Sequence, residues 1–96
     1  MKYVYVVTIL HRIYKTDKYD QSFILVTDGQ RQDVGGVFGT MEKALQYMQL
    51  LMDTYKGEFE IAKNGNDVTA ILSEIISDNG KISRDIVIEI KRYSVM

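Results

Sequence analysis

The stretch from Val34 to Tyr55 constrains the fold most, because several local signals agree there on an amphipathic helix. Thr40 is predicted to be the N-cap of the helix. Glu42 places negative charge in the first turn, where the helix dipole favours it. Gly57 follows the last apolar residue of the pattern and is predicted to end the helix. Apolar side chains recur between these caps at spacings of three and four residues: Met41, Ala44, Leu45, Met48, Leu51, Met52 and Tyr55. Such a helix packs one face on another layer and exposes the other face to water.

Four segments predict β-strands. Residues 1–14 are rich in Tyr, Val and Ile and are apolar on both alternating faces, which is typical of a strand central in its sheet. Residues 21–27 predict a second strand, and the short connection favours antiparallel pairing with the first. Residues 58–63 alternate apolar and acidic side chains, which predicts one face in the core. Residues 82–93 alternate most clearly of all.

A polar stretch separates the second predicted strand from the helix. It begins at Asp28-Gly29 and reads GQRQDVGG before the apolar pair Val37-Phe38. We predict a long loop here, and loops of this length in small domains are usually functional or mobile.

Residues 66–79 fit two structures. As a helix, the segment is capped by Asp67 and closed by Gly80. Its apolar stripe would be Val68, Ile71, Leu72, Ile75 and Ile76. As a strand, it would pair with the final segment across a tight Asn79-Gly80 turn, with Ile71 opposite Ile88. We predict the helix, because strand alternation would gather four apolar side chains on the second face.

These elements predict a single α+β domain over residues 1–96. Its sheet would be mainly antiparallel, with about four strands and two helices on one face, in the order β-β-α-β-α-β. The alternative keeps a single helix and makes residues 66–79 a hairpin strand.

The net charge and the lack of cysteine exclude several classes of function. A net charge of −1 excludes the strongly basic field of a nucleic-acid-binding domain, so we predict no direct contact with nucleic acid. The chain has no cysteine, which excludes disulfides and thiolate metal sites and is typical of a cytoplasmic protein. The apolar run of residues 3–10 is too short to span a membrane, and no membrane partner is predicted.

The sequence offers no catalytic constellation. His11 is the single histidine, and a lone histidine on a half-buried strand is more often a packed residue than a base. No nucleophile motif is present, and carboxylates with His11 alone give no metal-ligand spacing. We therefore predict a protein that is not an enzyme and has no metal or cofactor.

The glycine-rich run before the helix suggests a ligand-binding alternative. Exposed amides at Gly35, Gly36, Gly39 and Thr40 could hold a phosphate or carboxylate at a helix N-terminus. The run lacks the lysine of a P-loop and the spacing of a dinucleotide fingerprint, which favours a structural role. A small-ligand or nucleotide-binding module remains the alternative function.

Protein recognition is the favoured function. The chain has seven tyrosines, a residue that buries a large area at small entropic cost in interfaces. Tyr47 and Leu50 lie off the apolar stripe of the helix and could form an exposed patch with the predicted loop, which carries Arg31 and Asp33. We predict these four as partner-binding residues. The final strand, if it lies at a sheet edge, could pair with a copy of itself into a homodimer. An oligomeric structural protein is a further alternative.

Several short motifs are shared with a group of small bacterial and phage proteins. The matching residues are Tyr3-Val4-Tyr5, Leu10-His11, Gly36, Val37, Phe38, Thr40, Glu42, Ala44, Phe59 and Ile61. They resemble that family's YVY strand with its L-H pair, its G-V-F-x-T-x-E-x-A-like strand-to-helix junction and its F-x-I strand. The chain departs from the family in the longer polar loop and in the segment after Lys63. The resemblance implies a small α+β domain from a mobile element, without catalytic residues, that inhibits a host defence complex such as a CRISPR effector.

Overall fold

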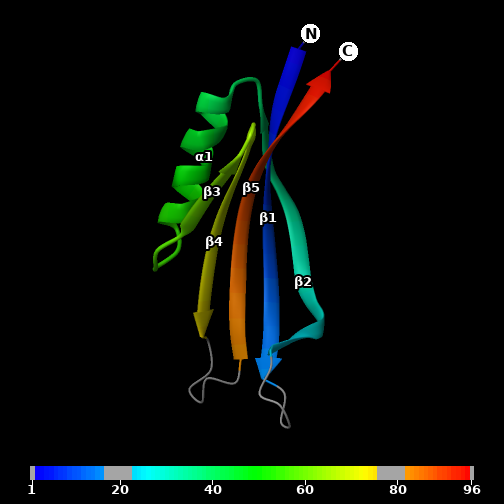
Figure 1. The fold of residues 1–96 in the computed structure, drawn as a ribbon, viewed down its shortest axis with the longest axis vertical. Helices are drawn as coiled ribbons and strands as arrows, with labels where there is room; N and C mark the ends of the chain where they lie inside the picture. The colour runs from blue at the N-terminus through cyan, green and yellow to red at the C-terminus, as the bar shows by residue number, and fades with distance from the viewer. Residues whose placement is uncertain (1, 17–22, 76–81, 96) are drawn as a thin grey trace.

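A computed structural model describes residues 2–16, 23–75 and 82–95 as one antiparallel sheet with a helix on one face (Figure 1). In chain order the elements are β1 (Lys2–Thr16), β2 (Phe23–Phe38), α1 (Met41–Asp53), β3 (Glu60–Asn64), β4 (Asp67–Ile75) and β5 (Ile82–Val95). The strand order across the sheet is β2-β1-β5-β4-β3. Both β1 and β5 are therefore internal strands. The position of β1 agrees with its apolar side chains on both faces.

The predicted arrangement of about four strands and two helices is wrong, because the described chain holds five strands and a single helix. The cause is segment 66–79, whose described part forms β4, while residues 76–79 lie outside the described chain. Asp67, predicted as a helix cap, begins β4 directly after the two-residue turn Gly65–Asn66. Gly65 has a φ of 62°, which glycine adopts without steric cost and which suits a tight hairpin.

Pairing with β5 decides the conformation of β4. Three alternating residues of β4, Val68, Ala70 and Leu72, are buried on the face that bears the helix. A helical stripe would also have placed Ile71 and Ile75 in the core, yet both lie on the opposite face and are exposed. Cross-strand contacts along the whole of β4 outweigh a local helical pattern whose preference amounts to tenths of a kcal/mol per residue.

The core lies between α1 and one face of the sheet. Its buried members are Val7, Ala44, Met48, Val68, Ala70, Leu72, Ile86, Ile88 and Ile90. Aromatic rings close the core around the helix, with Phe38 against Tyr47 at a centroid distance of 5.1 Å and Tyr55 against Phe59 at 6.1 Å. By contrast, every residue of β3 is exposed, so the prediction that residues 58–63 bury one strand face is wrong for β3 itself.

The predicted loop between the second strand and the helix is also wrong, because β2 continues to Phe38. The strand tolerates its polar stretch because it lies at the edge of the sheet and breaks register twice. One break lies between the pairs Arg12↔Gln30 and Tyr14↔Leu25, where β2 carries extra residues around Asp28-Gly29. The other leaves Gly35 unpaired as a β-bulge.

The sheet is longer than its helical cover. The molecule measures 53 × 25 × 21 Å, whereas a helix of 13 residues is only about 20 Å long. The helix lies beside the end of the sheet that carries both chain termini, and the other end extends beyond it (Figure 1). Much of the sheet is consequently available for contacts outside the core.

The N-cap of α1 is confirmed. The Oγ1 of Thr40 accepts a hydrogen bond of 3.2 Å from the backbone nitrogen of Lys43, and the φ and ψ of Thr40 are extended. We expect Thr40→Ala to lower the free energy of unfolding by about 1 kcal/mol, because one helix N–H loses its acceptor. Urea unfolding measures this change. Thr40→Ser keeps the hydroxyl and should lose less than half as much, and equal losses in the two variants would contradict a capping role.

Candidate functional site

The free edge of β2 carries two of the predicted partner-binding residues. Asp33 pairs with Ile9 and Arg31 with His11, so both lie on the face of the sheet that bears the helix. Their side chains are exposed by 50% and 79% and form an ion pair of 3.0 Å. Residues 30–34 of this strand are all exposed.

The other two predicted residues lie on α1, beside this strand. A Cβ built on Gly35 would lie 3.1 Å from the Tyr47 ring, so the ring rests against β2. Tyr47 is half-buried rather than part of an exposed patch. Leu50 follows three residues later on the same side of the helix and is 64% exposed. Residues 30–34, Tyr47 and Leu50 together are called the β2 edge surface below.

The glycine-rich residues are divided between two places. Gly35 and Gly36 belong to β2, and a Cβ on Gly36 would lie 2.8 Å from the ring of Phe38. Their missing side chains thus make room for two aromatic rings. Gly39 and Thr40 lie at the junction with the helix, where the hydroxyl of Thr40 is already occupied by capping. The structure does not gather the four residues into one cradle.

The face of the sheet opposite the helix was missed from the sequence. By alternation and register it bears side chains from all five strands: Val4, Val6, Thr8, Leu10, Arg12, Tyr14, Gln30, Gln32, Val34, Val37, Glu60, Ala62, Asp67, Thr69, Ile71, Ser73, Ile75, Ser83, Asp85, Val87, Glu89, Lys91 and Tyr93. No element of the described chain packs on it. We call it the uncovered face. The signal that could have found it is the apolar character of both faces of residues 1–14.

Side chains on the uncovered face form rows across the strands. One apolar row runs through Leu10, Val87 and Ile71. The next row toward the chain termini is Thr8, Glu89 and Thr69, and the row on the other side is Arg12, Asp85 and Ser73. The apolar row ends at Gln32 on β2 and at Glu60 on β3. Its apolar side chains are therefore bordered by polar ones on all sides.

Two ion pairs lie on this face. Lys91 lies 3.4 Å from Glu89. The Glu89 carboxylate raises the pKa of Lys91, first as a hydrogen-bond acceptor and then through its charge. Arg12 lies 3.6 Å from Asp85, which also accepts a 2.8 Å hydrogen bond from Ser73. The Nε atom of Arg12 has no hydrogen-bond partner among the described residues.

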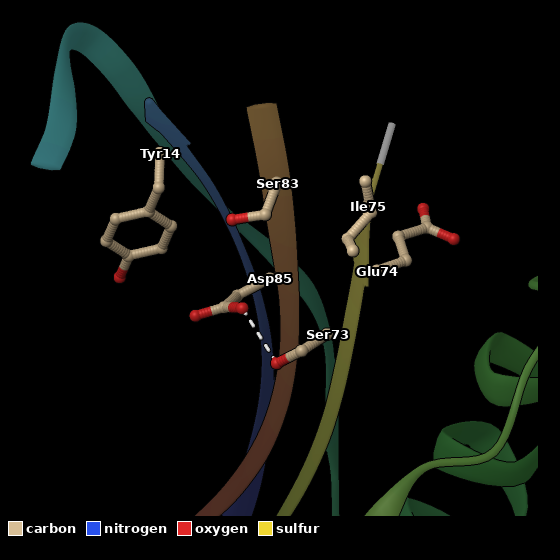
Figure 2. Close-up of a pocket in the computed structure, with 6 residues that line it drawn as sticks. All are labelled: Tyr14, Ser73, Glu74, Ile75, Ser83 and Asp85. Atoms are coloured by element: carbon tan, nitrogen blue, oxygen red, sulfur yellow. Dashed lines mark hydrogen bonds between the residues drawn. The ribbon is translucent and has the colours of Figure 1, made fainter. Parts of the chain in front are cut away.

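A shallow hollow marks the end of the uncovered face that is farthest from the helix. Figure 2 shows the hydrogen bond between Ser73 and Asp85 on its floor, with Tyr14 and Ser83 beside them. The Glu74 carboxylate points away and is paired with Arg84. The hollow offers hydroxyl groups and a carboxylate that is already partnered, and no group poised as a base or nucleophile.

His11 packs beside Tyr55, with a ring-centroid distance of 6.3 Å. Across residues 2–16, 23–75 and 82–95, no three His, Asp or Glu side chains are grouped so that they could hold a metal ion. Within the same ranges, no helix is long and apolar enough to cross a membrane.

Comparison with known proteins gives no relative from which a role could be transferred. No protein-family model, curated protein or solved structure matches the chain.

Proposed function

We propose that this chain is a non-enzymatic protein-binding module that engages its partner through the β2 edge surface. The observation that carries the proposal is the free outer edge of a 16-residue strand with no neighbouring strand among the described residues. An extended segment of a partner can add to such an edge through main-chain hydrogen bonds, while flanking side chains select the segment.

The flanking side chains suit a reversible contact. Arg31 and Asp33 offer a donor and an acceptor group whose mutual pairing is exposed. An exposed ion pair is worth less than about 1 kcal/mol, so exchanging it for contacts with a partner costs little. Leu50 adds apolar surface, and the ring of Tyr47 supports the strand from the helix side.

The class of partner comes from the family resemblance described above. A small domain from a mobile element, without catalytic residues, is suited to blocking a larger host assembly by occupying its surface. We propose a bacterial defence complex, such as a CRISPR effector, as the partner.

The proposal is tested in a bacterium whose CRISPR system restricts a plasmid. Expression of the wild-type chain should raise plasmid transformation, and the doubly substituted Arg31→Glu, Leu50→Asp chain should lose at least nine tenths of that effect. Both positions are exposed, and surface substitutions change stability by about 0.5 kcal/mol or less, so the fold should persist. Capture of the effector on the tagged chain should fall in parallel.

A matched control changes the opposite edge of the sheet. Lys63→Glu with Ile61→Asp makes the same kinds of substitution on the exposed strand β3. This control should keep full activity. Equal losses in the two double variants would show that the β2 edge surface is not the binding site, and no effect of the wild-type chain would remove the defence complex as its target.

A further inference from the structure

We infer that residues 30–34 of β2 pair antiparallel with the same residues of a second copy of this chain, so that two sheets join edge to edge in a symmetric dimer. The expected dimer through the final strand is excluded, because β5 is paired on both sides, with β1 and with β4. The dimer uses the same edge as the proposed partner, so the two contacts exclude each other. Its evidence and its tests do not involve a defence complex and therefore stand apart from the proposed function.

Residues 30–34 are the regular part of an irregular strand. They pair in antiparallel order with residues 8–12 of β1, and the register breaks on both sides of this stretch. A bulge bends its strand, so a straight neighbour fits only between the two breaks. All five residues are exposed, and no strand of the described chain lies on their outer side. The midpoint of this stretch is Gln32.

The charges of this stretch complement each other about its midpoint. The two-fold axis of an antiparallel strand pair passes midway between two residues that lie directly opposite each other. With Gln32 on the axis, Arg31 lies opposite Asp33 of the second copy, twice by symmetry. An axis at Arg31 or at Asp33 would instead set like charges directly opposite each other, which destabilises a strand pair. Charge therefore selects one register.

The main chain accepts the same register. Along an edge strand, alternate residues point their N–H and C=O groups outward, and an axis at a residue sets outward-pointing residues opposite one another. The pair then forms about four to six main-chain hydrogen bonds. Arg31 and Asp33 of one chain already lie 3.0 Å apart. Their copies add two further charges on the same face, so that the four side chains form one network of alternating sign.

The helices leave this edge free. An axis perpendicular to the sheet keeps both helices on one face and, because the paired strands run in opposite directions, at opposite ends of the paired stretch. Figure 1 shows α1 beside the end of the sheet that carries both termini and not over the outer edge of β2. The other edge strand, β3, offers no matching charges, since pairing about its middle residue Ala62 sets Ile61 opposite Lys63.

The first test is a disulfide across the axis, since the chain has no cysteine of its own. In Gln32→Cys the two thiols lie directly opposite each other, with Cβ atoms about 5 Å apart, close to disulfide range. Glutathione disulfide should convert most of this variant into a covalent dimer. Gln30→Cys is the matched control on the same face of the strand. Its Cβ is offset from its copy by four residues, or about 13 Å, so it should stay largely monomeric. Equal crosslinking of the two variants would overturn the inference.

The second test is the mass in solution, measured by light scattering. Five residues per strand make a small interface, so we expect a dissociation constant on the order of 10 μM. At about 100 μM the wild-type mass should approach twice 11.1 kDa. Arg31→Glu should weaken the dimer at least tenfold, because the new carboxylate faces Asp33 of the second copy.

Adding Asp33→Arg to Arg31→Glu should restore most of the affinity, since opposite charges then face each other again. A partner that recognises the native charges would not regain its contact, so the plasmid effect should stay lost in this double variant. A monomeric wild type, or a double variant that dimerises no more tightly than Arg31→Glu alone, would overturn the inferred pairing. Equal thermal unfolding of the three chains at low concentration confirms that the charge changes do not act through the fold.

Discussion

Replacing Ile88 with alanine should lower the free energy of unfolding by about 2–5 kcal/mol, the usual range for deleting a buried isoleucine side chain beyond Cβ. Ile88 is fully buried at the centre of β5, between Ile9 of β1 and Ala70 of β4. The small neighbour Ala70 cannot fill the cavity that the substitution leaves. For a domain of 96 residues with a marginal core, this is a large part of the total stability.

Urea unfolding followed by circular dichroism measures the loss, and Ile75→Ala is the matched control. Ile75 is 67% exposed, so its truncation should change stability by no more than about 0.5 kcal/mol. Comparable losses at the two positions would contradict the assignment of the core to the helix-bearing face.

Gly57→Ala should cost about 2 kcal/mol, the second largest effect expected from a single substitution. Gly57 has a φ of 126°, which residues with a side chain rarely adopt, and an added Cβ would lie 2.9 Å from Leu72. Leu72 is buried, so it cannot move aside freely. The substitution therefore combines backbone strain with overpacking.

Thermal unfolding of Gly57→Ala measures the loss, and Gly39→Ala is the control for the general effect of replacing a glycine by alanine. No atom lies within 4 Å of a Cβ placed on Gly39, so that variant should be neutral or slightly more stable, because it reduces the freedom of the unfolded chain. A neutral Gly57→Ala would show that the connection between α1 and β3 relaxes without cost.

The sequence pattern predicted the helix α1 but not the full extent of β2 or the strand β4. The N-cap Thr40 was predicted because capping depends on a few neighbouring residues, whereas the helix ends at Asp53 with Thr54 as its C-cap, short of the predicted stop at Gly57. The helix prediction for residues 66–79 failed because its spacing fits both periods, and only pairing with β5 decides between them. The loop prediction at Asp28-Gly29 failed because a register break returns the chain to the same strand.

The candidate surfaces were predictable only in part. Arg31, Asp33, Tyr47 and Leu50 were singled out one by one, and the structure places them along β2 and the adjoining side of α1. The uncovered face was not predicted, because its rows combine residues that lie far apart in the chain. Cross-strand register is needed to bring such residues together.

The strand order also determines when the sheet can be completed. β1 and β2 form one hairpin, and β3 and β4 form another. The two hairpins become one sheet only when β5, which follows both in sequence, pairs with β1 on one side and with β4 on the other. During synthesis both hairpins precede the strand that joins them. Such distant pairing slows folding and leaves unpaired strand edges exposed in the meantime. Until β5 is in place, these exposed edges make a chain of this topology prone to aggregation.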